Sequence, residues 1–209
     1  MKYLIAIPCM DMVHTAFLKS LLSLDKPEGT RFGLTCSSLI YDARTQLARK
    51  AIDEGFDRVL WLDSDMEFEP DFMKRLAEDM DDGRELVSGL YFKRKMPVQP
   101  VVYKEVGYYK DEDSVTPVAV PYEDYPINDI FKVAGVGFGG VMVSVDLIKR
   151  VQDKFGLPFS PILGFGEDLS FCKRAEDLGA TLWCDSRLKM GHIGMASVTE
   201  SVYLSNRGV

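Results

Sequence analysis

Two aspartates that follow a strongly apolar segment are the residues best suited to chemistry in this chain. Asp63-Ser64-Asp65 comes directly after residues 58–62, which have the composition of a strand buried in a sheet. In open α/β sheets, ligands bind beyond the carboxyl ends of the strands, and alternation along an extended chain points Asp63 and Asp65 the same way. Converging carboxylates repel unless a cation offsets their charge, and oxygen ligands suit Mg²⁺ or Mn²⁺. The alternative interpretation is an acidic turn that caps the next helix.

A second candidate site is a glycine-rich loop that ends in two acids, Gly164-Phe165-Gly166-Glu167-Asp168. The glycines allow the backbone to approach a ligand closely, and the acidic pair opens a predicted helix. The two carboxylates either cap the free backbone amides of the first helical turn or point into a pocket. A carboxylate in such a place acts as a general base when substrate burial raises its pKa.

Three further sites carry basic or metal-ligating side chains. His192 lies between glycines and offers an imidazole nitrogen to the same cation, or else has a structural role. Arg44 is at the start of a predicted helix, where the helix N-terminus and a guanidinium favour an anion, or else it is a solvated residue. Lys93-Arg94-Lys95 either faces phosphates or forms a solvated loop.

The elements that must position these side chains alternate regularly between strand and helix. Continuous apolar runs predict buried strands, and apolar residues at helical spacing predict helices between them. The expected strands are 3–9, 31–37, 58–62, 86–92, 131–136, 141–145 and 181–185, and the expected helices are 13–24, 40–54, 70–80, one that ends near 155, and 167–178. This order predicts βαβ crossovers and an α/β fold with a mainly parallel sheet flanked by helices.

The alternation breaks at residues 93–130, which hold five prolines, several tyrosines and the acidic stretch Asp111-Glu112-Asp113. Strand signals there are weak and confined to about 98–110. We therefore expect an irregular surface excursion, which acts as a mobile lid over the site. The length favours one domain over residues 1–209.

Composition limits the class of protein. With 25 basic and 32 acidic side chains the formal net charge is −7, which argues against broad binding to a nucleic-acid backbone. No stretch approaches the ~20 uncharged apolar residues of a transmembrane segment. The short apolar N-terminus does not resemble a signal peptide, so we expect a cytoplasmic protein. The four cysteines lie far apart in the sequence, and each is expected to act as a small hydrophobic residue.

Together these residues resemble the nucleotide-sugar glycosyltransferases of the GT-A fold, most closely the inverting family-2 type. The resemblance spans residues 3–194 and rests on the order of motifs along the chain: an apolar first strand that ends in Pro8, the helix that bears Arg44, Asp63-Ser64-Asp65 after Trp61-Leu62, a glycine-rich return strand, Glu167-Asp168 and a late His192. It implies a Rossmann-like GT-A fold with the irregular excursion of residues 93–130 on the acceptor side. It also implies transfer of a sugar from a UDP- or GDP-sugar to an acceptor hydroxyl, with Mn²⁺ or Mg²⁺ as cofactor. The acceptor stays unidentified.

The resemblance implies donor-side roles for five residues. Asp65 and His192 would coordinate the divalent cation that bridges the donor diphosphate. Asp63 would contact the ribose, or reach the metal through water. The segment after Pro8 would border the nucleotide base, and Arg44 would contact the nucleotide or its diphosphate.

On the acceptor side, the resemblance makes Asp168 the base that deprotonates the acceptor hydroxyl, with Glu167 shaping the acceptor site. Attack by the deprotonated oxygen on the face opposite the nucleotide inverts the anomeric configuration. Retention stays open, because the sequence does not determine the pose of the donor.

Other classes share parts of the pattern. A sugar-phosphate nucleotidyltransferase usually carries a glycine-rich basic loop after its first strand, where this chain has Pro8-Cys9-Met10-Asp11-Met12. A haloacid-dehalogenase phosphatase places Asp-x-Asp after its first strand, whereas here the motif follows the third. A non-catalytic nucleotide- or carbohydrate-binding module on a GT-A core is the remaining alternative, and it would make Asp65, Asp168 or His192 dispensable.

Overall fold

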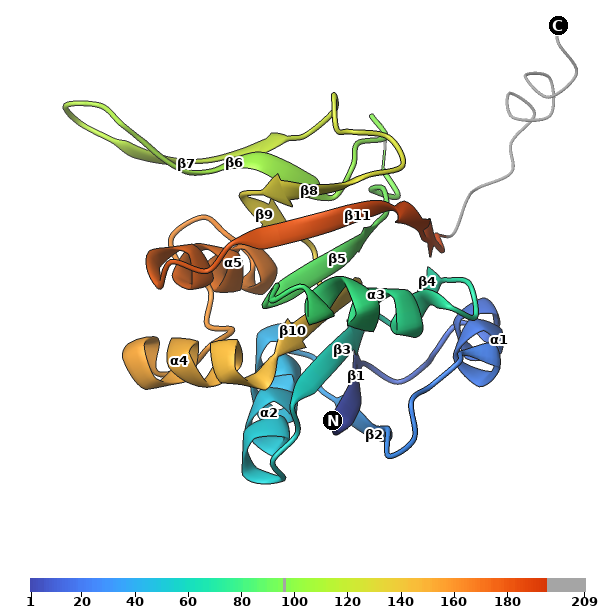
Figure 1. Ribbon diagram of the computed structural model, residues 1–209. Coiled ribbons are helices and arrows are strands. Elements are labelled where there is room, and N and C mark those ends of the chain that lie inside the picture. The colour runs from blue at the N-terminus through green and yellow to red at the C-terminus, as the bar shows by residue number, and fades with distance from the viewer. Residues whose placement is uncertain (96, 195–209) are drawn as a thin grey trace, which may run out of the picture.

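A computed structural model describes residues 1–95 and 97–194. They form a seven-stranded mixed sheet between layers of helices, a three-stranded sheet beside it (Figure 1) and a two-stranded sheet. In chain order the elements are β1 (Tyr3–Cys9), α1 (Thr15–Ser23), β2 (Arg31–Cys36), α2 (Ile40–Asp53), β3 (Arg58–Leu62), β4 (Met66–Glu67), α3 (Phe72–Asp81), β5 (Leu86–Leu90), β6 (Val102–Lys110), β7 (Val115–Pro121), β8 (Ile130–Val133), β9 (Gly135–Val136), β10 (Gly140–Ser144), α4 (Val145–Phe155), α5 (Glu167–Asp177), β11 (Leu182–Lys189) and β12 (Gly191–His192).

The main sheet has the strand order β2-β1-β3-β10-β5-β11-β8, in which β10 and β8 run antiparallel to their neighbours and the other strands run parallel to one another. The predicted α/β class and the mainly parallel sheet flanked by helices are therefore confirmed. Strand β1 lies between β2 and β3, so the chain changes its direction of winding there. Such a switch point leaves a crevice at the carboxyl ends of the two central strands, where ligands bind in folds of this kind.

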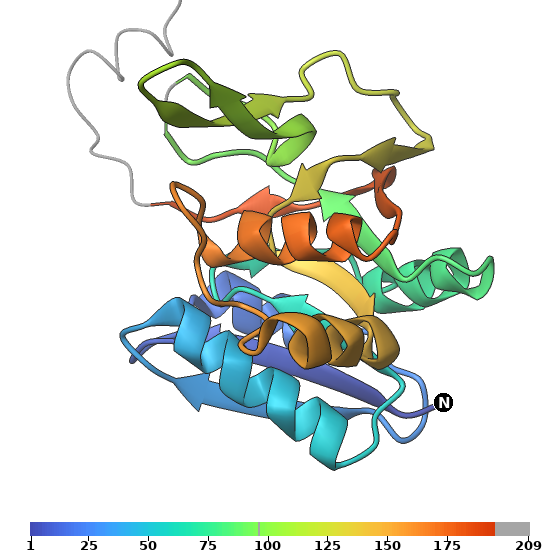
Figure 2. The same ribbon diagram turned by 90° about the vertical axis from the view of Figure 1, so that its left-hand side faces the viewer.

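Two apolar clusters fill the space on either side of the main sheet. In β1, Leu4 and Ala6 join the cluster covered by α2, α4 and α5, whereas Ile5 and Ile7 join the cluster covered by α1 and α3 (Figure 2). Every residue of β1 is buried. This explains why the strand reads as a continuous apolar run rather than as an alternating one.

The segment expected to be irregular contains a regular antiparallel hairpin, β6–β7, which joins β9 in a three-stranded sheet of order β7-β6-β9. The sequence signal for the hairpin is weak because no residue of β7 is fully buried. At its base, Tyr103 and Val106 pack against Phe165, just before α5, and against Leu169 in the first turn of α5. The predicted strand 131–136 divides into β8 in the main sheet and β9 in the small one. The role of 93–130 as a lid stays a prediction.

The helices are short and end at local sequence signals. The longest, α2, has 14 residues and stops before Gly55, whose φ of +66° is a left-handed conformation that glycine adopts easily. Helix α4 begins with the Ser144 hydroxyl accepting a hydrogen bond from the Leu147 amide at 3.2 Å. Across residues 1–95 and 97–194, no helix is long and apolar enough to span a bilayer.

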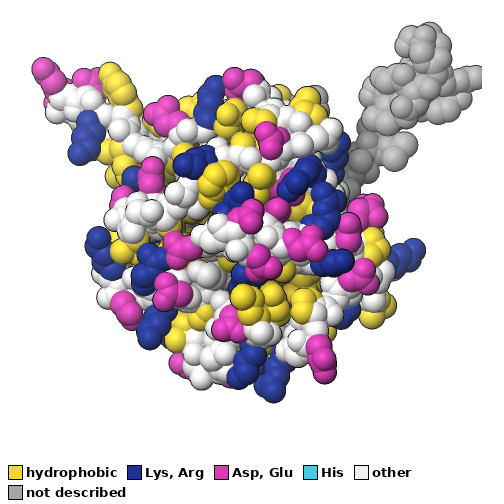
Figure 3. Space-filling model, in the orientation of Figure 1, with side chains coloured by type: hydrophobic (Ala, Val, Ile, Leu, Met, Phe, Trp, Pro, Cys, Tyr) yellow, Lys and Arg dark blue, Asp and Glu magenta, His cyan; other side chains and the backbone are white. Residues whose placement is uncertain are grey.

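Acidic and basic side chains are interspersed over the face of the molecule seen in Figure 3. This mixture reflects the composition of the chain, which has 25 basic and 32 acidic side chains. This face therefore lacks the uniformly basic surface that binding to a nucleic-acid backbone needs.

Candidate active site

A pocket of about 340 Å³ opens at the carboxyl edge of the main sheet, beside the switch point at β1 and β3. Its lining comes from the ends of β1, β2, β3 and β5, the N-terminal part of α2, the turn before β10, the first turn of α5, and β12. All the site residues predicted from the sequence line it: Pro8, Arg44, Asp63, Asp65, Glu167, Asp168 and His192. The fold thus brings residues from most of the chain to one place.

The Asp63-Ser64-Asp65 turn is held by hydrogen bonds from three distant segments. The Asp63 amide donates to the Gly139 carbonyl at 3.2 Å, and the carbonyls of the next two residues accept from the amides of His14 at 3.0 Å and Ile193 at 2.8 Å. The alternative of a helix-capping turn is wrong, because α3 begins only at Phe72. The two aspartates are therefore free to face the pocket.

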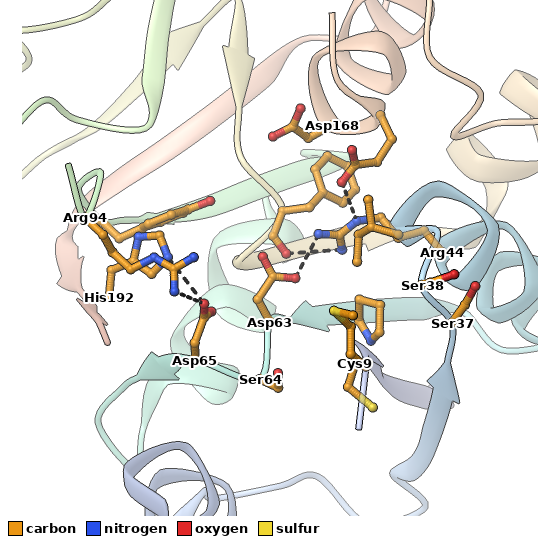
Figure 4. Close-up of a pocket in the computed structure, with 16 residues that line it drawn as sticks. Cys9, Ser37, Ser38, Arg44, Asp63, Ser64, Asp65, Arg94, Asp168 and His192 are labelled. Carbon is orange, nitrogen blue, oxygen red and sulfur yellow. Dashed lines mark hydrogen bonds and ion pairs between the residues drawn. The ribbon is translucent and has the colours of Figure 1, made fainter. Parts of the chain in front are cut away.

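Arg44 links two of the pocket's carboxylates (Figure 4). Its side chain is only 2% exposed; Nη2 donates to Asp63 Oδ1 at 2.8 Å, and Nε donates to Glu167 Oε1 at 3.2 Å. The guanidinium also lies 5.8 Å and 5.4 Å from the ring centroids of Trp61 and Phe138. Burial alone would lower the Arg44 pKa, but the two carboxylates outweigh it and raise that pKa. The anions next to Arg44 are thus protein groups, and its contact with a nucleotide stays a prediction.

Asp65 faces two cationic or metal-ligating side chains on the other side of the pocket (Figure 4). Arg94 Nη1 lies 2.7 Å from Asp65 Oδ2, and His192 Nε2 lies 3.7 Å from the same oxygen. His192 Nδ1 is 2.8 Å from the Phe92 carbonyl; because a carbonyl only accepts, Nδ1 carries the proton and Nε2 faces Asp65. Burial would raise the Asp65 pKa, but the nearby His192 imidazole and the charge of Arg94 lower it.

These residues fit a divalent cation that takes most of its ligands from substrate and water. Asp65 and His192 offer one oxygen and one nitrogen on the same wall. Within residues 1–95 and 97–194, no cluster of three or more His, Cys, Asp or Glu side chains is arranged to hold a metal ion. Mn²⁺ and Mg²⁺ often use few protein ligands and complete their shell with water and phosphates. Arg94 holds the same Asp65 oxygen, so a cation can bind there only if Arg94 moves.

Asp168 differs from its neighbour Glu167 in environment. Glu167 is bonded to Arg44, whereas Asp168 accepts a hydrogen bond from the Leu169 amide at 2.7 Å in the first turn of α5 and still lines the pocket. Burial is the main cause that raises the pKa of Asp168 to about 6, and the negative charge of Glu167 adds to it. The Asp168 carboxylate is thus poised to accept a proton near neutral pH.

Tyr91 lines the pocket and was missed from the sequence, where it lies within the predicted strand 86–92. Its hydroxyl accepts a hydrogen bond from the Gly139 amide at 3.2 Å, and its ring meets that of His192 edge-on at 5.4 Å. A Cβ atom at Gly137 would collide with the Tyr91 hydroxyl, so the glycine-rich return segment is required here. Tyr91 directly follows the carboxyl end of β5, just as Asp63 directly follows β3. The same sequence signal could therefore have identified it.

Comparison with known proteins gives matches in structure but not in sequence. No protein-family model matches the chain, and no curated protein matches it in sequence. A197 from STIV is similar in structure with a TM-score of 0.68 at 17% identity, over 93% of this chain and 87% of that one. GalNAc-T7 with UDP, GalNAc and Mn²⁺ has a TM-score of 0.62 at 12% identity, over 94% of this chain and 44% of that one. This chain has the GT-A fold.

A third GT-A structure agrees. S. aureus TarS 1–349 in complex with UDP-GlcNAc has a TM-score of 0.59 at 15% identity, and the match covers 96% of this chain and 61% of TarS. The GT-A chain described here thus spans less than two thirds of the TarS and GalNAc-T7 structures. Both of these proteins are GT-A glycosyltransferases, so the predicted fold family is confirmed.

Proposed function

We propose that this GT-A chain is a metal-dependent glycosyltransferase, which moves a sugar from a nucleoside-diphosphate sugar to an acceptor hydroxyl with inversion. The observation that carries the proposal is the meeting of Asp63, Asp65, Asp168 and His192 in one pocket at the sheet switch point. The UDP and Mn²⁺ with GalNAc-T7 and the UDP-GlcNAc with TarS support the donor class.

On the donor side, the chain would hold the nucleotide along the ends of β1 and β2. Pro8 lines the pocket there with the residues that follow β2, and Asp63, which lines it too, would contact the ribose. Asp65 and His192 would hold the divalent cation, with the diphosphate supplying further ligands. When bound, such a cation would offset the negative charge that develops on the leaving nucleoside diphosphate.

On the acceptor side, Asp168 takes the proton of the acceptor hydroxyl. The acceptor oxygen forms a bond to the anomeric carbon, the bond from that carbon to the diphosphate oxygen breaks, and its electron pair leaves with the nucleotide. With a pKa raised to about 6 by burial, Asp168 is mostly ionised at neutral pH and yet basic enough to assist the transfer. Glu167, bonded to Arg44, shapes the wall beside it.

The proposal predicts that nucleotide binding depends on a divalent cation. We expect UDP or GDP to bind in the presence of Mn²⁺ with a Kd at least ~10-fold lower than in EDTA, since paired carboxylates repel a diphosphate without a cation between them. Asp65→Asn should remove most of the Mn²⁺ effect, and His192→Gln should remove less of it, because water can fill one coordination position. Isothermal titration calorimetry measures all of these affinities.

The matched control for that experiment is Asp153→Asn, which removes the same charge from an exposed position on α4. It should bind UDP and Mn²⁺ like the unmodified protein. Equal nucleotide affinity in Mn²⁺ and EDTA would remove the metal from the proposal. Wild-type metal affinity in His192→Gln would remove that residue from the ligand set.

A further inference from the structure

A second cavity, of about 590 Å³, continues from the donor pocket past Asp168. Tyr91, Arg94, Asp168 and His192 line both spaces, so the two are joined at the proposed base. The remaining lining residues belong to the second cavity and not to the donor pocket: Lys93, Lys95, Val101, Tyr103 and Gly194.

The charge of this cavity is opposite to that of the whole chain. Lys93, Arg94 and Lys95 line it with a single carboxylate, Asp168, in a chain of formal net charge −7. Arg94 is paired with Asp65 of the donor pocket, whereas Lys93 and Lys95 form no ion pair among residues 1–95 and 97–194. Lys93 Nζ lies 3.1 Å from the amide oxygen of Gln99 and 5.9 Å from the ring centroid of Tyr103. Both of these partners are uncharged, so Lys93 is held in place while its charge is left available.

We propose that this cavity binds the acceptor and that the acceptor is anionic, carrying a phosphate or carboxylate group near the hydroxyl that Asp168 deprotonates. The inference rests on the proposed function, because it uses Asp168 as the boundary between donor and acceptor. Lysines without a carboxylate partner, such as Lys93 and Lys95, attract and orient an anion, and they raise its local concentration in a cleft. Because Lys93 and Lys95 do not line the donor pocket, the donor diphosphate does not account for them.

Inorganic phosphate is the probe for this site, added to protein already saturated with UDP and Mn²⁺ so that the donor pocket is filled. We expect calorimetry at low salt to detect phosphate binding, and Lys93→Gln/Lys95→Gln to weaken it about 2- to 30-fold, the effect of losing two charge contacts that solvent screens. Lys110→Gln/Lys149→Gln removes the same charge from exposed positions on β6 and α4 and should leave the phosphate Kd unchanged. A parallel titration with acetate distinguishes the two kinds of site. Acetate should bind more tightly than phosphate to a carboxylate site, and less tightly to a phosphate site.

Equal phosphate affinity in the two double variants would overturn the proposal, and so would phosphate binding that UDP abolishes. A protein that binds no UDP at all would instead contradict the proposed function. Phosphate binding that still depends on Lys93 and Lys95 in that protein would support an anion site there. The two failures are therefore distinguishable.

A separate observation concerns Cys9 and Cys36, which form a close thiol pair at the rim of the donor pocket. They are the last residues of β1 and β2, the parallel register places them directly opposite each other, and their Sγ atoms are 3.4 Å apart. Cys9 is buried and lines the pocket, whereas Cys36 is exposed. The sequence gives no sign of the pair, since the two residues lie on different strands and follow no Cys-x-x-Cys pattern.

We infer that Cys9 and Cys36 are a site of reversible oxidation, joined as a disulfide by hydrogen peroxide. The exposed Cys36 thiolate attacks the peroxide and becomes a sulfenic acid with release of water; the Cys9 thiol then attacks that sulfur, and a second water leaves. The two thiols lose two electrons, which reduce one peroxide to two waters. A disulfide needs a sulfur separation of about 2.05 Å, so the two Sγ atoms must approach each other from 3.4 Å, on strands that are already paired.

Thiol counting and peptide mass spectrometry test this inference. After peroxide treatment we expect the free thiols to fall from four to two, with Cys9 linked to Cys36, and a dithiol reductant to restore all four. The buried Cys172 and Cys184 should stay reduced and serve as the internal control. Cys9→Ser and Cys36→Ser should each abolish the linkage. Sulfinic acid at Cys36 beside a reduced Cys9, or four thiols that persist, would contradict it.

Discussion

Asp168→Asn is expected to lower turnover by ~10²–10⁴-fold, the scale of losing a general base, while donor affinity stays within a few-fold of the unmodified protein. Asparagine keeps the size of the side chain and an oxygen that can accept from the Leu169 amide. It removes only the group that takes the acceptor proton. Steady-state transfer and donor binding, measured on the same preparation, separate these two effects.

The pH dependence of the reaction gives an independent readout of the same residue. Because burial raises the pKa of Asp168 to about 6, we expect turnover to rise with pH through about 6, where half of this carboxyl is ionised, and to level off about one pH unit higher. Asp168→Asn should lack this acid limb.

The raised pKa of Asp168 also affects the stability of the folded protein. The pKa of this carboxyl is higher in the folded than in the unfolded protein, so ionising it destabilises the folded state. The loss of stability is complete above about pH 6 and absent below about pH 4, where the carboxyl is protonated in both states. Asp168→Asn should therefore unfold at the same or a higher temperature at pH 8.

Asp177→Asn, at the other end of α5, is the matched control for this variant. It should keep transfer activity and the acid limb of the pH profile. Loss of donor affinity in step with turnover in Asp168→Asn would make Asp168 a binding residue. The assignment of an inverting mechanism would then lose its main support.

Arg44→Met is expected to destabilise the protein by about 2–4 kcal/mol. Removing one partner of a buried ion pair leaves an uncompensated charge, which typically costs ~3–5 kcal/mol. The side chains of Asp63 and Glu167 are 32% and 16% exposed, so solvent reduces that cost. Urea unfolding measures the change. Arg49→Met on the same helix, where the arginine is exposed, is the control and should change stability far less.

A triple variant separates the loss of charge balance from the loss of packing. Arg44→Met combined with Asp63→Asn and Glu167→Gln removes the two carboxylates that the guanidinium neutralises. We expect it to recover much of the stability lost in Arg44→Met, because the effects of contacting residues are not additive. If Arg44→Met and Arg49→Met had the same free energy of unfolding, Arg44 would not hold these carboxylates together.

Sequence alone was sufficient for the order and type of the main elements. Strands such as β1 and β3 are buried on both faces, so they appear as continuous apolar runs, and the helices between them show apolar residues at helical spacing. The position of Asp63 and Asp65 directly after β3 also follows from local sequence, because the end of a parallel strand is a predictable place.

The hairpin β6–β7 shows where local sequence fails. Strand β7 has no fully buried residue, so its sequence does not alternate clearly between apolar and polar residues. Its prolines also resemble those of a loop. The division of residues 130–136 between two sheets was equally hidden, because pairing partners far along the chain decide it: β8 pairs with β11, whereas β9 pairs with β6.

By itself, the sequence determined the α/β alternation and the types of residue available for chemistry, because burial and backbone propensity act over a few neighbouring residues. Only the tertiary structure decided which of these residues meet. It placed the guanidinium of Arg44 between two carboxylates and joined a basic cavity to the site beside Asp168. It also set the Cys9 and Cys36 thiols 3.4 Å apart. Such contacts depend on strand order and register, which arise from packing across the whole chain rather than from local sequence.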